Sequence, residues 1–212
     1  MAYKHGVYTS EVPTSIIPPV NTTGGLPVVI GTAPVHLATD RVPANKPVLC
    51  YTYAEAAAQF GYSKDIESYT LCEAVKCMFS LYNRAPIVLI NVLDPAKHKT
   101  TVSDTEITLT DKVAKIDAAV LMETLVVKKA SAGQPLTKGA DYEAEYDSDG
   151  VVVITALDGG EIADASSVFV TYNKLDASQV DSDDIIGGID VSTGASTGLE
   201  CINEVFTVTR LV

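Results

Sequence analysis

The chain has 212 residues, of which 47% are hydrophobic and 20% are charged, a composition typical of a folded protein. Its formal net charge of -12 argues against a surface that wraps DNA or binds an anionic membrane, because both require clustered lysine and arginine. The charge is uneven: residues 1–95 carry a net charge of -1, and residues 96–212 carry -11. This asymmetry predicts two regions with different surroundings.

Residues 1–20 are predicted to form an extended arm. Pro13, Pro18 and Pro19 disfavour a helix and remove backbone donors. Since no partner strand follows nearby, the arm either packs across its own sheet or pairs with a strand edge of another chain. The apolar side chains expected to carry such a contact are Tyr3, Val7, Tyr8, Val12, Ile16 and Ile17.

Residues 21–97 are predicted to form part of an α/β core. Two continuous apolar runs, 26–31 and 87–92, are typical of strands buried on both faces. The segments between them begin helices, so the two strands are expected to be parallel and joined by a helical crossover.

Paired Thr and Glu residues three positions apart indicate where the helices begin. Thr52 with Glu55 forms a capping-box pattern, and Gly61 is expected to end that helix. Thr70 with Glu73 repeats the pattern. The helix that follows is expected to present one apolar face made of Leu71, Val75, Met78, Phe79 and Tyr82.

Residues 98–189 change to an alternating pattern that predicts an inserted antiparallel β domain, a small sandwich or barrel. Turn residues at 147–150 and 158–160 are expected to close tight hairpins. In the segment Tyr142–Tyr146 the tyrosines are expected to face the core and the glutamates the solvent. The expected strands lie at 106–110, 125–128, 141–146, 151–156 and 167–172.

Residues 190–212 are expected to return to the core. Thr197 and Glu200 form a third capping-box pattern, and the helix is expected to align Leu199, Ile202, Val205 and Phe206. The chain ends without a cap or turn, which suggests a truncated protein. The overall prediction is an α+β fold: an incomplete α/β core with parallel strands and crossover helices, an inserted antiparallel β domain and an extended arm.

Motifs for catalysis, metals or cofactors are missing from the sequence. It contains no phosphate-binding loop, no zinc-protease motif and no nucleophile elbow. We therefore predict no enzymatic activity, no metal and no cofactor. No signal peptide is recognised, and the longest apolar run, about 85–93, is too short to cross a bilayer. The cysteines, expected to be buried reduced thiols of a cytosolic protein, are Cys50, Cys72, Cys77 and Cys201.

Three clusters permit a functional interpretation beside a structural one, and the structural one is favoured for each. The stretch 147–150 resembles the start of a calcium loop but also suits a hairpin turn. The acidic cluster Asp181, Asp183 and Asp184 suits a weak cation site or a solvated linker. His36 and Asp40 allow a catalytic triad, whereas a surface histidine is the simpler interpretation.

Several blocks, in order, resemble contractile-tail sheath proteins of myophages, prophages and phage-tail-like bacteriocins. The first comprises Gly6–Pro13, Ile16–Pro19 and Val28–Ala33. The second runs from the helix Leu71–Tyr82 into Ala85–Val92. The third covers a β domain between 139 and 172, and the last runs from 198 to 206. Sheath proteins are substantially longer, so the resemblance implies an N-terminal portion.

The resemblance implies a structural subunit that stacks in hexameric rings around a tail tube and contracts to drive the tube through a cell envelope. It implies partners in other sheath subunits, the tube protein, the baseplate and the tail terminator, without nucleic acid or membrane insertion. The location implied is the virion tail, assembled in the bacterial cytoplasm. It also assigns intersubunit strand exchange to about residues 3–18.

The alternative is a baseplate or adhesin-like binding module. Such a module would carry exposed aromatic residues or metal sites at the loop tips of its β domain, whereas an outward-facing sheath insertion would carry polar turns.

Overall fold

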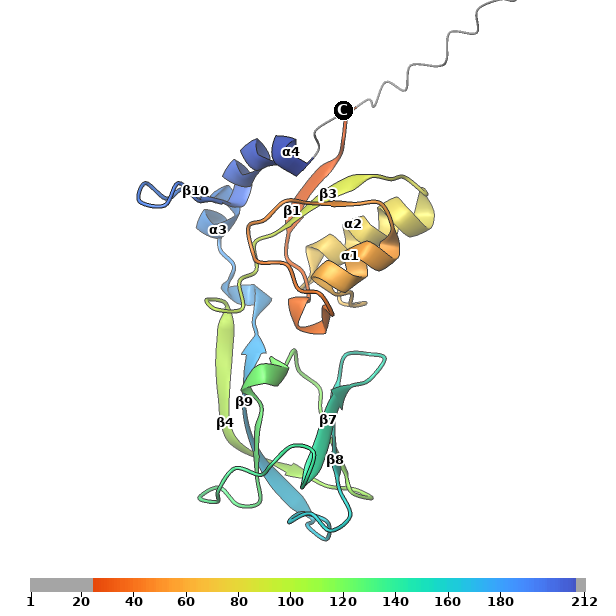
Figure 1. Ribbon diagram of the computed structural model, residues 1–212, viewed down its shortest axis with the longest axis vertical. Helices are drawn as coiled ribbons and strands as arrows, with labels where there is room; N and C mark the ends of the chain where they lie inside the picture. The colour runs from red at the N-terminus through yellow and green to blue at the C-terminus, as the bar shows by residue number, and fades with distance from the viewer. Residues whose placement is uncertain (1–24, 209–212) are drawn as a thin grey trace, which may run out of the picture.

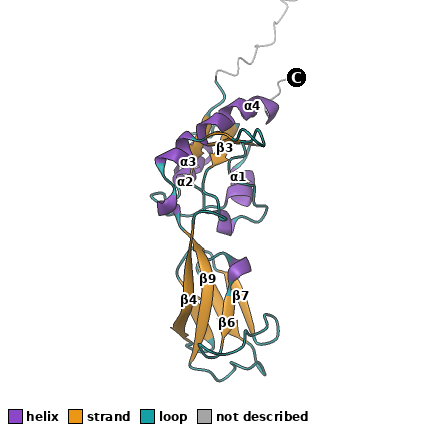
Figure 2. Cartoon of the chain, turned by 90° about the vertical axis from the view of Figure 1, so that its left-hand side faces the viewer, coloured by secondary structure: helices purple, strands orange, loops and turns teal. Residues whose placement is uncertain are grey.

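The computed structural model describes residues 25–208, and the predicted arm with its six candidate residues lies outside the described residues. Figure 1 shows two stacked parts. We call residues 25–97 and 176–208 the α/β part, and residues 98–175 the β part. In Figure 2 the helices gather mainly in the α/β part, and the long strands lie in the β part.

A three-stranded sheet forms the centre of the α/β part. Strand β1 (Val28–Gly31) lies parallel to β3 (Ile87–Asn91), which confirms the predicted parallel pair. A short strand that the sequence did not predict, β2 (Val48–Cys50), pairs antiparallel with the other side of β3. Every residue of β3 is buried, because helices cover both faces of the central strand.

The two faces of β3 belong to different apolar clusters. Ile87 and Leu89 join the cluster that contains Phe60 of α1 (Tyr53–Phe60) and Leu71 of α2 (Thr70–Val75). On the opposite face, Val88 and Ile90 contact the cluster formed with Cys201 and Val205. Those two residues belong to η5 (Gly198–Cys201) and α4 (Ile202–Val208). Successive side chains of β3 point to opposite faces of the sheet, so the strand packs against a helical layer on each face.

One of the three predicted capping boxes is confirmed at these helices. Thr52 accepts a hydrogen bond from the Glu55 amide at 3.2 Å, the Glu55 carboxylate accepts from the Thr52 amide, and Gly61 follows the helix. The prediction at Thr70 is wrong because Thr70 already lies inside α2. Its hydroxyl instead accepts from the Thr32 amide at 3.1 Å, so it fastens the helix to the end of β1.

The prediction at Thr197 is also wrong. Its hydroxyl accepts a hydrogen bond from the Gly188 amide at 3.0 Å rather than capping η5. The expected apolar face of the last helix is rotated, because Leu199 and Ile202 are exposed while Cys201 and Val205 are buried. Phe206 lies among the residues whose side chains are not described.

The second helix departs from its predicted periodicity at its end. After α2 the chain continues as a π-helical turn, η2 (Lys76–Leu81), in which the Tyr82 amide bonds the Cys77 carbonyl five residues earlier. Leu71 and Val75, which precede this turn, are buried as predicted. The wider turn breaks the 3.6-residue spacing, so Tyr82 after it is 70% exposed.

Two antiparallel sheets build the β part. One has the order β4-β9-β6 and the other β5-β8-β7, and buried side chains from both join one apolar cluster. The strands are β4 (Lys99–Thr108), β5 (Val113–Ile116), β6 (Val126–Lys128), β7 (Tyr142–Tyr146), β8 (Val152–Ala156) and β9 (Ser167–Leu175). Strand β5 was not predicted, and β4 shares only its last three residues with the predicted strand 106–110. The other four confirm predicted strands with shifted ends.

The two predicted hairpin turns differ in outcome. Residues 147–150 join β7 to its neighbour β8, with Gly150 at φ 84°, which confirms the first hairpin. Residues 158–160 do not close a hairpin, because β8 and β9 belong to different sheets. On β7, Tyr142 is buried and Tyr146 half-buried while Glu143 and Glu145 are exposed, as the alternation predicted.

Candidate interaction surfaces

Sheet edges are the first feature of the α/β part that offers a contact. In the described part of the chain, β1 and β2 each pair with β3 on one side only. An unpaired edge presents backbone amide and carbonyl groups that an added strand can satisfy. Strand β1 is the first described strand of the chain, so its edge is the one nearest in sequence to the predicted arm.

Large exposed apolar side chains are confined to the α/β part among residues 25–208. They are Tyr51, Tyr53, Ile66, Leu81, Tyr82, Ile185, Ile186, Ile189, Val191, Leu199 and Ile202. The described β part exposes none of this kind. Its turns consist of residues such as Asp147, Ser148 and Asp149.

Six of these residues lie between 185 and 202, on the projecting segment that contains α3 (Ser182–Ile186) and the hairpin β10 (Gly188–Ile189) with β11 (Ser196–Thr197). We define the acidic apolar patch by Ile186, Ile189 and Val191 together with Asp183, Asp190 and Glu200. Residues 175–209 include seven acidic residues and no lysine or arginine.

Aspartates begin α3, which settles the nature of the acidic cluster. Asp181 accepts from the amides of Asp183 and Asp184, and Asp184 accepts from the Asp181 amide, forming a capping box. The favoured interpretation is thus correct about solvation, since Asp181 and Asp183 are exposed, and wrong about the linker, since the cluster begins a helix. Asp184 also accepts from Nε2 of the buried His98 at 3.1 Å, because Nδ1 of His98 accepts from the Asp94 amide at 2.9 Å.

A second apolar surface lies at the end of η2. We define the basic apolar patch by Leu81 and Tyr82, which are 64% and 70% exposed, together with the exposed side chains of Lys76 and Arg84. Neither cation forms an ion pair with another described residue. Glu73, one helical turn before Lys76, is the nearest acidic neighbour in sequence.

His36 lies between the two parts, so the interpretation as a surface histidine is wrong. Its ring centroid is 6.0 Å from that of Tyr69 and 6.0 Å from that of Tyr146. Burial lowers the pKa of His36 to about 4, although the negative charge of Glu123 acts in the opposite direction. Its Nδ1 is buried and has no hydrogen-bond partner among the described residues. Asp40 is exposed.

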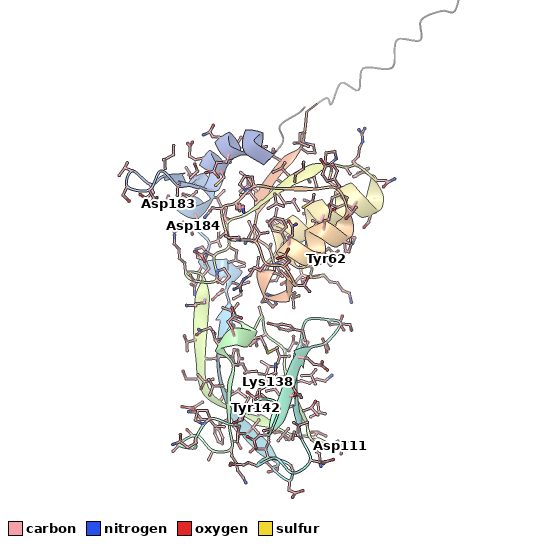
Figure 3. The ribbon with its side chains drawn as sticks, in the orientation of Figure 1. Tyr62, Asp111, Lys138, Tyr142, Asp183 and Asp184 are labelled. Carbon is pink, nitrogen blue, oxygen red and sulfur yellow. The ribbon has the colours of Figure 1, made fainter. Side chains whose placement is uncertain are left out.

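Ion pairs also cross between the parts. Arg41 meets Glu123 at 3.1 Å, and Lys64 meets Asp149 at 2.9 Å. Leu37, Tyr62 and Tyr146 line a cleft of about 460 Å³ next to the second pair. The labelled Tyr62 lies on the side of the α/β part that faces the β part in Figure 3. These exposed pairs add little stability. The buried contact between the parts comes from Leu121 and Leu175 of the β part, which join the apolar cluster of the α/β part, and from the packing around His36.

Thiols and carboxylates form no chemical centre in the described residues. Cys50, Cys72 and Cys201 are buried free thiols, and Cys77 is half-buried. Burial raises the pKa of Cys50 and of Cys201 to about 11, which keeps both protonated and weakly nucleophilic. No group of three His, Cys, Asp or Glu side chains within residues 25–208 is arranged to hold a metal ion. No helix in this range is long and apolar enough to span a bilayer.

Comparison with known proteins gives one informative relative. No protein-family model matches the chain. A tail sheath protein of Burkholderia phage BcepMu is 30% identical over 206 residues, which is 96% of this chain. The chain spans 40% of the length of that protein. The resemblance expected from the ordered sequence blocks is thus confirmed.

Proposed function

Because the chain is homologous to a phage tail sheath protein, we propose that it forms part of a structural subunit of a contractile tail sheath. Such subunits would stack as hexameric rings around a tail tube and contract to drive the tube through the target envelope. The observation that carries the proposal is the similarity along 96% of the chain. A role in structure rather than catalysis follows from it.

The surface of the β part supports a sheath subunit over a receptor-binding module. A loop-tip receptor site would need exposed aromatic side chains or a metal, and the described β part has no large exposed apolar side chain. Residues 98–175 instead carry 13 acidic and 7 basic residues. A charged, apolar-poor surface keeps a crowded assembly soluble, which suits an outward-facing insertion.

Strand exchange through the arm would hold the subunits together. In this proposal, residues 3–18 of one subunit add to a strand edge of a neighbouring subunit, with Val7, Tyr8 and Val12 on its apolar positions. Main-chain hydrogen bonds would tether the subunits while their rigid cores rotate during contraction. The partners would be other sheath subunits, the tube protein, the baseplate and the tail terminator, all in the virion tail.

Deleting residues 1–20 from the complete gene product tests the arm. We expect unchanged circular dichroism, since the arm precedes every described element, and loss of sheath-like polymers in electron micrographs. Substituting Val7→Asp and Val12→Asp together should have the same effect, whereas the matched polar change Thr9→Ala should not. Normal sheaths after the deletion would overturn strand exchange through the arm. The absence of any tubular polymer from the unmodified protein would overturn the proposed function.

A further inference from the structure

The two exposed patches of the α/β part have complementary composition. The acidic apolar patch combines Ile186, Ile189 and the fully exposed Val191 with carboxylates. The basic apolar patch combines Leu81 and Tyr82 with Lys76 and Arg84. An apolar centre with charged surroundings of opposite sign is the arrangement that two docking surfaces use to gain both affinity and orientation.

The patches lie on opposite sides of the α/β part. In Figure 1, α3 and β10 project at the left, and the yellow helix ends at the right, where η2 leads into β3. Figure 3 places Asp183 and Asp184 at the same left-hand margin. Because one rigid sheet separates them, the patches of a single chain cannot meet each other. Neither patch is covered by another described residue range, so both face outward from residues 25–208.

The acidic apolar patch is held in a fixed shape. Asp190 accepts hydrogen bonds from the amides of Ser192 and Thr193 at 2.8 and 3.0 Å, which orders the tip of the hairpin. At the base of the hairpin, the Gly198 amide donates to the Asn45 side chain at 2.9 Å. A preordered surface loses little conformational entropy on binding, which favours docking.

We infer that the acidic apolar patch of one subunit docks on the basic apolar patch of the next subunit. The occupant is a second copy of this chain, because one chain supplies both halves of the complementary pair. The contact joins two different surfaces, so it is heterologous, and repetition generates a ring or a helix rather than a closed dimer. This inference rests on the proposed function and adds a side-chain interface to the strand exchange proposed for the arm.

Cysteine cross-linking of mixed single variants tests the pairing. In a Cys77→Ser background of the complete protein, Tyr82→Cys is mixed with Ile189→Cys, and the assembled protein is oxidised. A heterologous contact predicts cross-linked dimers from the mixture and few from either variant alone. Ile66→Cys, exposed but outside both patches, replaces Tyr82→Cys in the matched control and should give no cross-link.

Charge reversal provides a second and independent measurement. Arg84→Glu or Glu200→Lys alone should weaken association by about tenfold in sedimentation, because each places like charges across the contact. The double variant, with both changes, should recover most of the loss. Raising the salt concentration should weaken the association of the unmodified protein and reduce the difference in association between the variants.

The outcomes separate this interface from the proposed function. Sheath-like polymers without the mixed cross-link would overturn the interface and leave the sheath role intact. Cross-linking of Ile189→Cys to itself, to another segment of the same chain or to another tail protein would also overturn it. Additive losses in the charge-reversal pair, with no recovery, would show that Arg84 and Glu200 do not face one another.

Discussion

The β part and the α/β part bury equally large clusters but present different surfaces. Each part has one main cluster of 14 buried apolar residues among those described, although Leu121 and Leu175 of the β part complete the cluster of the α/β part, so neither lacks a core. Yet every large exposed apolar side chain among residues 25–208 belongs to the α/β part. The α/β part therefore has the surfaces suited to association, and the β part has a surface suited to solvent.

The largest effect is expected from a core substitution in the β part, which tests whether the two parts unfold separately. Ile154 is fully buried between the two sheets, so Ile154→Ala should lower the free energy of unfolding of the β part by about 2–5 kcal/mol. Native-state hydrogen exchange should show lost protection in β5–β9 and little change in β1–β3. Ile154→Val, with one methyl group removed, should cost about 0.5–1.5 kcal/mol. Equal loss in both parts would show that they unfold as one unit.

Acid should weaken the contact between the parts through His36. Its pKa is lowered to about 4 in the folded protein, so the unfolded chain takes up the proton first as the pH falls below about 6.5. Stability is therefore retained near pH 7 and lost towards pH 4, by about 2–3 kcal/mol.

The variant His36→Leu should remove that part of the pH dependence. Denaturant unfolding of both proteins at about pH 7 and pH 4.5 gives the change in the free energy of unfolding between the two pH values. Comparing the two proteins cancels the contribution of the carboxylates that they share. Parallel pH profiles for the two proteins would contradict a neutral His36 at the junction.

A smaller effect is expected at the hairpin that carries the acidic apolar patch. Gly187 has φ 68°, and a β-carbon there would collide with the Thr197 carbonyl group. Gly187→Ala should therefore cost about 1–3 kcal/mol and loosen residues 188–198, measured by thermal unfolding and local hydrogen exchange. The neighbouring Gly188→Ala is the control, because open space surrounds that position. Equal effects of both substitutions on thermal unfolding would mean that the hairpin backbone relaxes around the added β-carbon.

Local sequence patterns predicted the elements whose defining residues bond or alternate within one short segment of the chain. The apolar runs gave β1 and β3, and Thr52 with Glu55 gave the start of α1, since those two residues bond each other. The same pattern failed at Thr70 and Thr197 because their hydroxyls bond residues outside the helix that each would begin: Thr32, which is 38 positions away, and Gly188, which is 9 positions away. No local signal distinguishes these cases.

The candidate surfaces were predicted less well, for two physical reasons. The π-helical turn moved Tyr82 from the expected apolar face to solvent, and helical periodicity does not anticipate such a turn. His36 is half-buried, with Tyr146 of the β part beside its ring, a contact between residues 110 positions apart. The deficit of lysine and arginine after residue 174 was readable in the sequence and could have indicated the acidic apolar patch.

The chain enters and leaves the β part at two neighbouring points. Lys99, at the start of β4, pairs with Leu175, at the end of β9, so the two crossing points are neighbours. A turn of a few residues would therefore rejoin the remaining chain without moving either end. We therefore expect that the β part can be replaced by another module whose ends lie equally close together, provided that the buried contacts of Leu121 and Leu175 are kept.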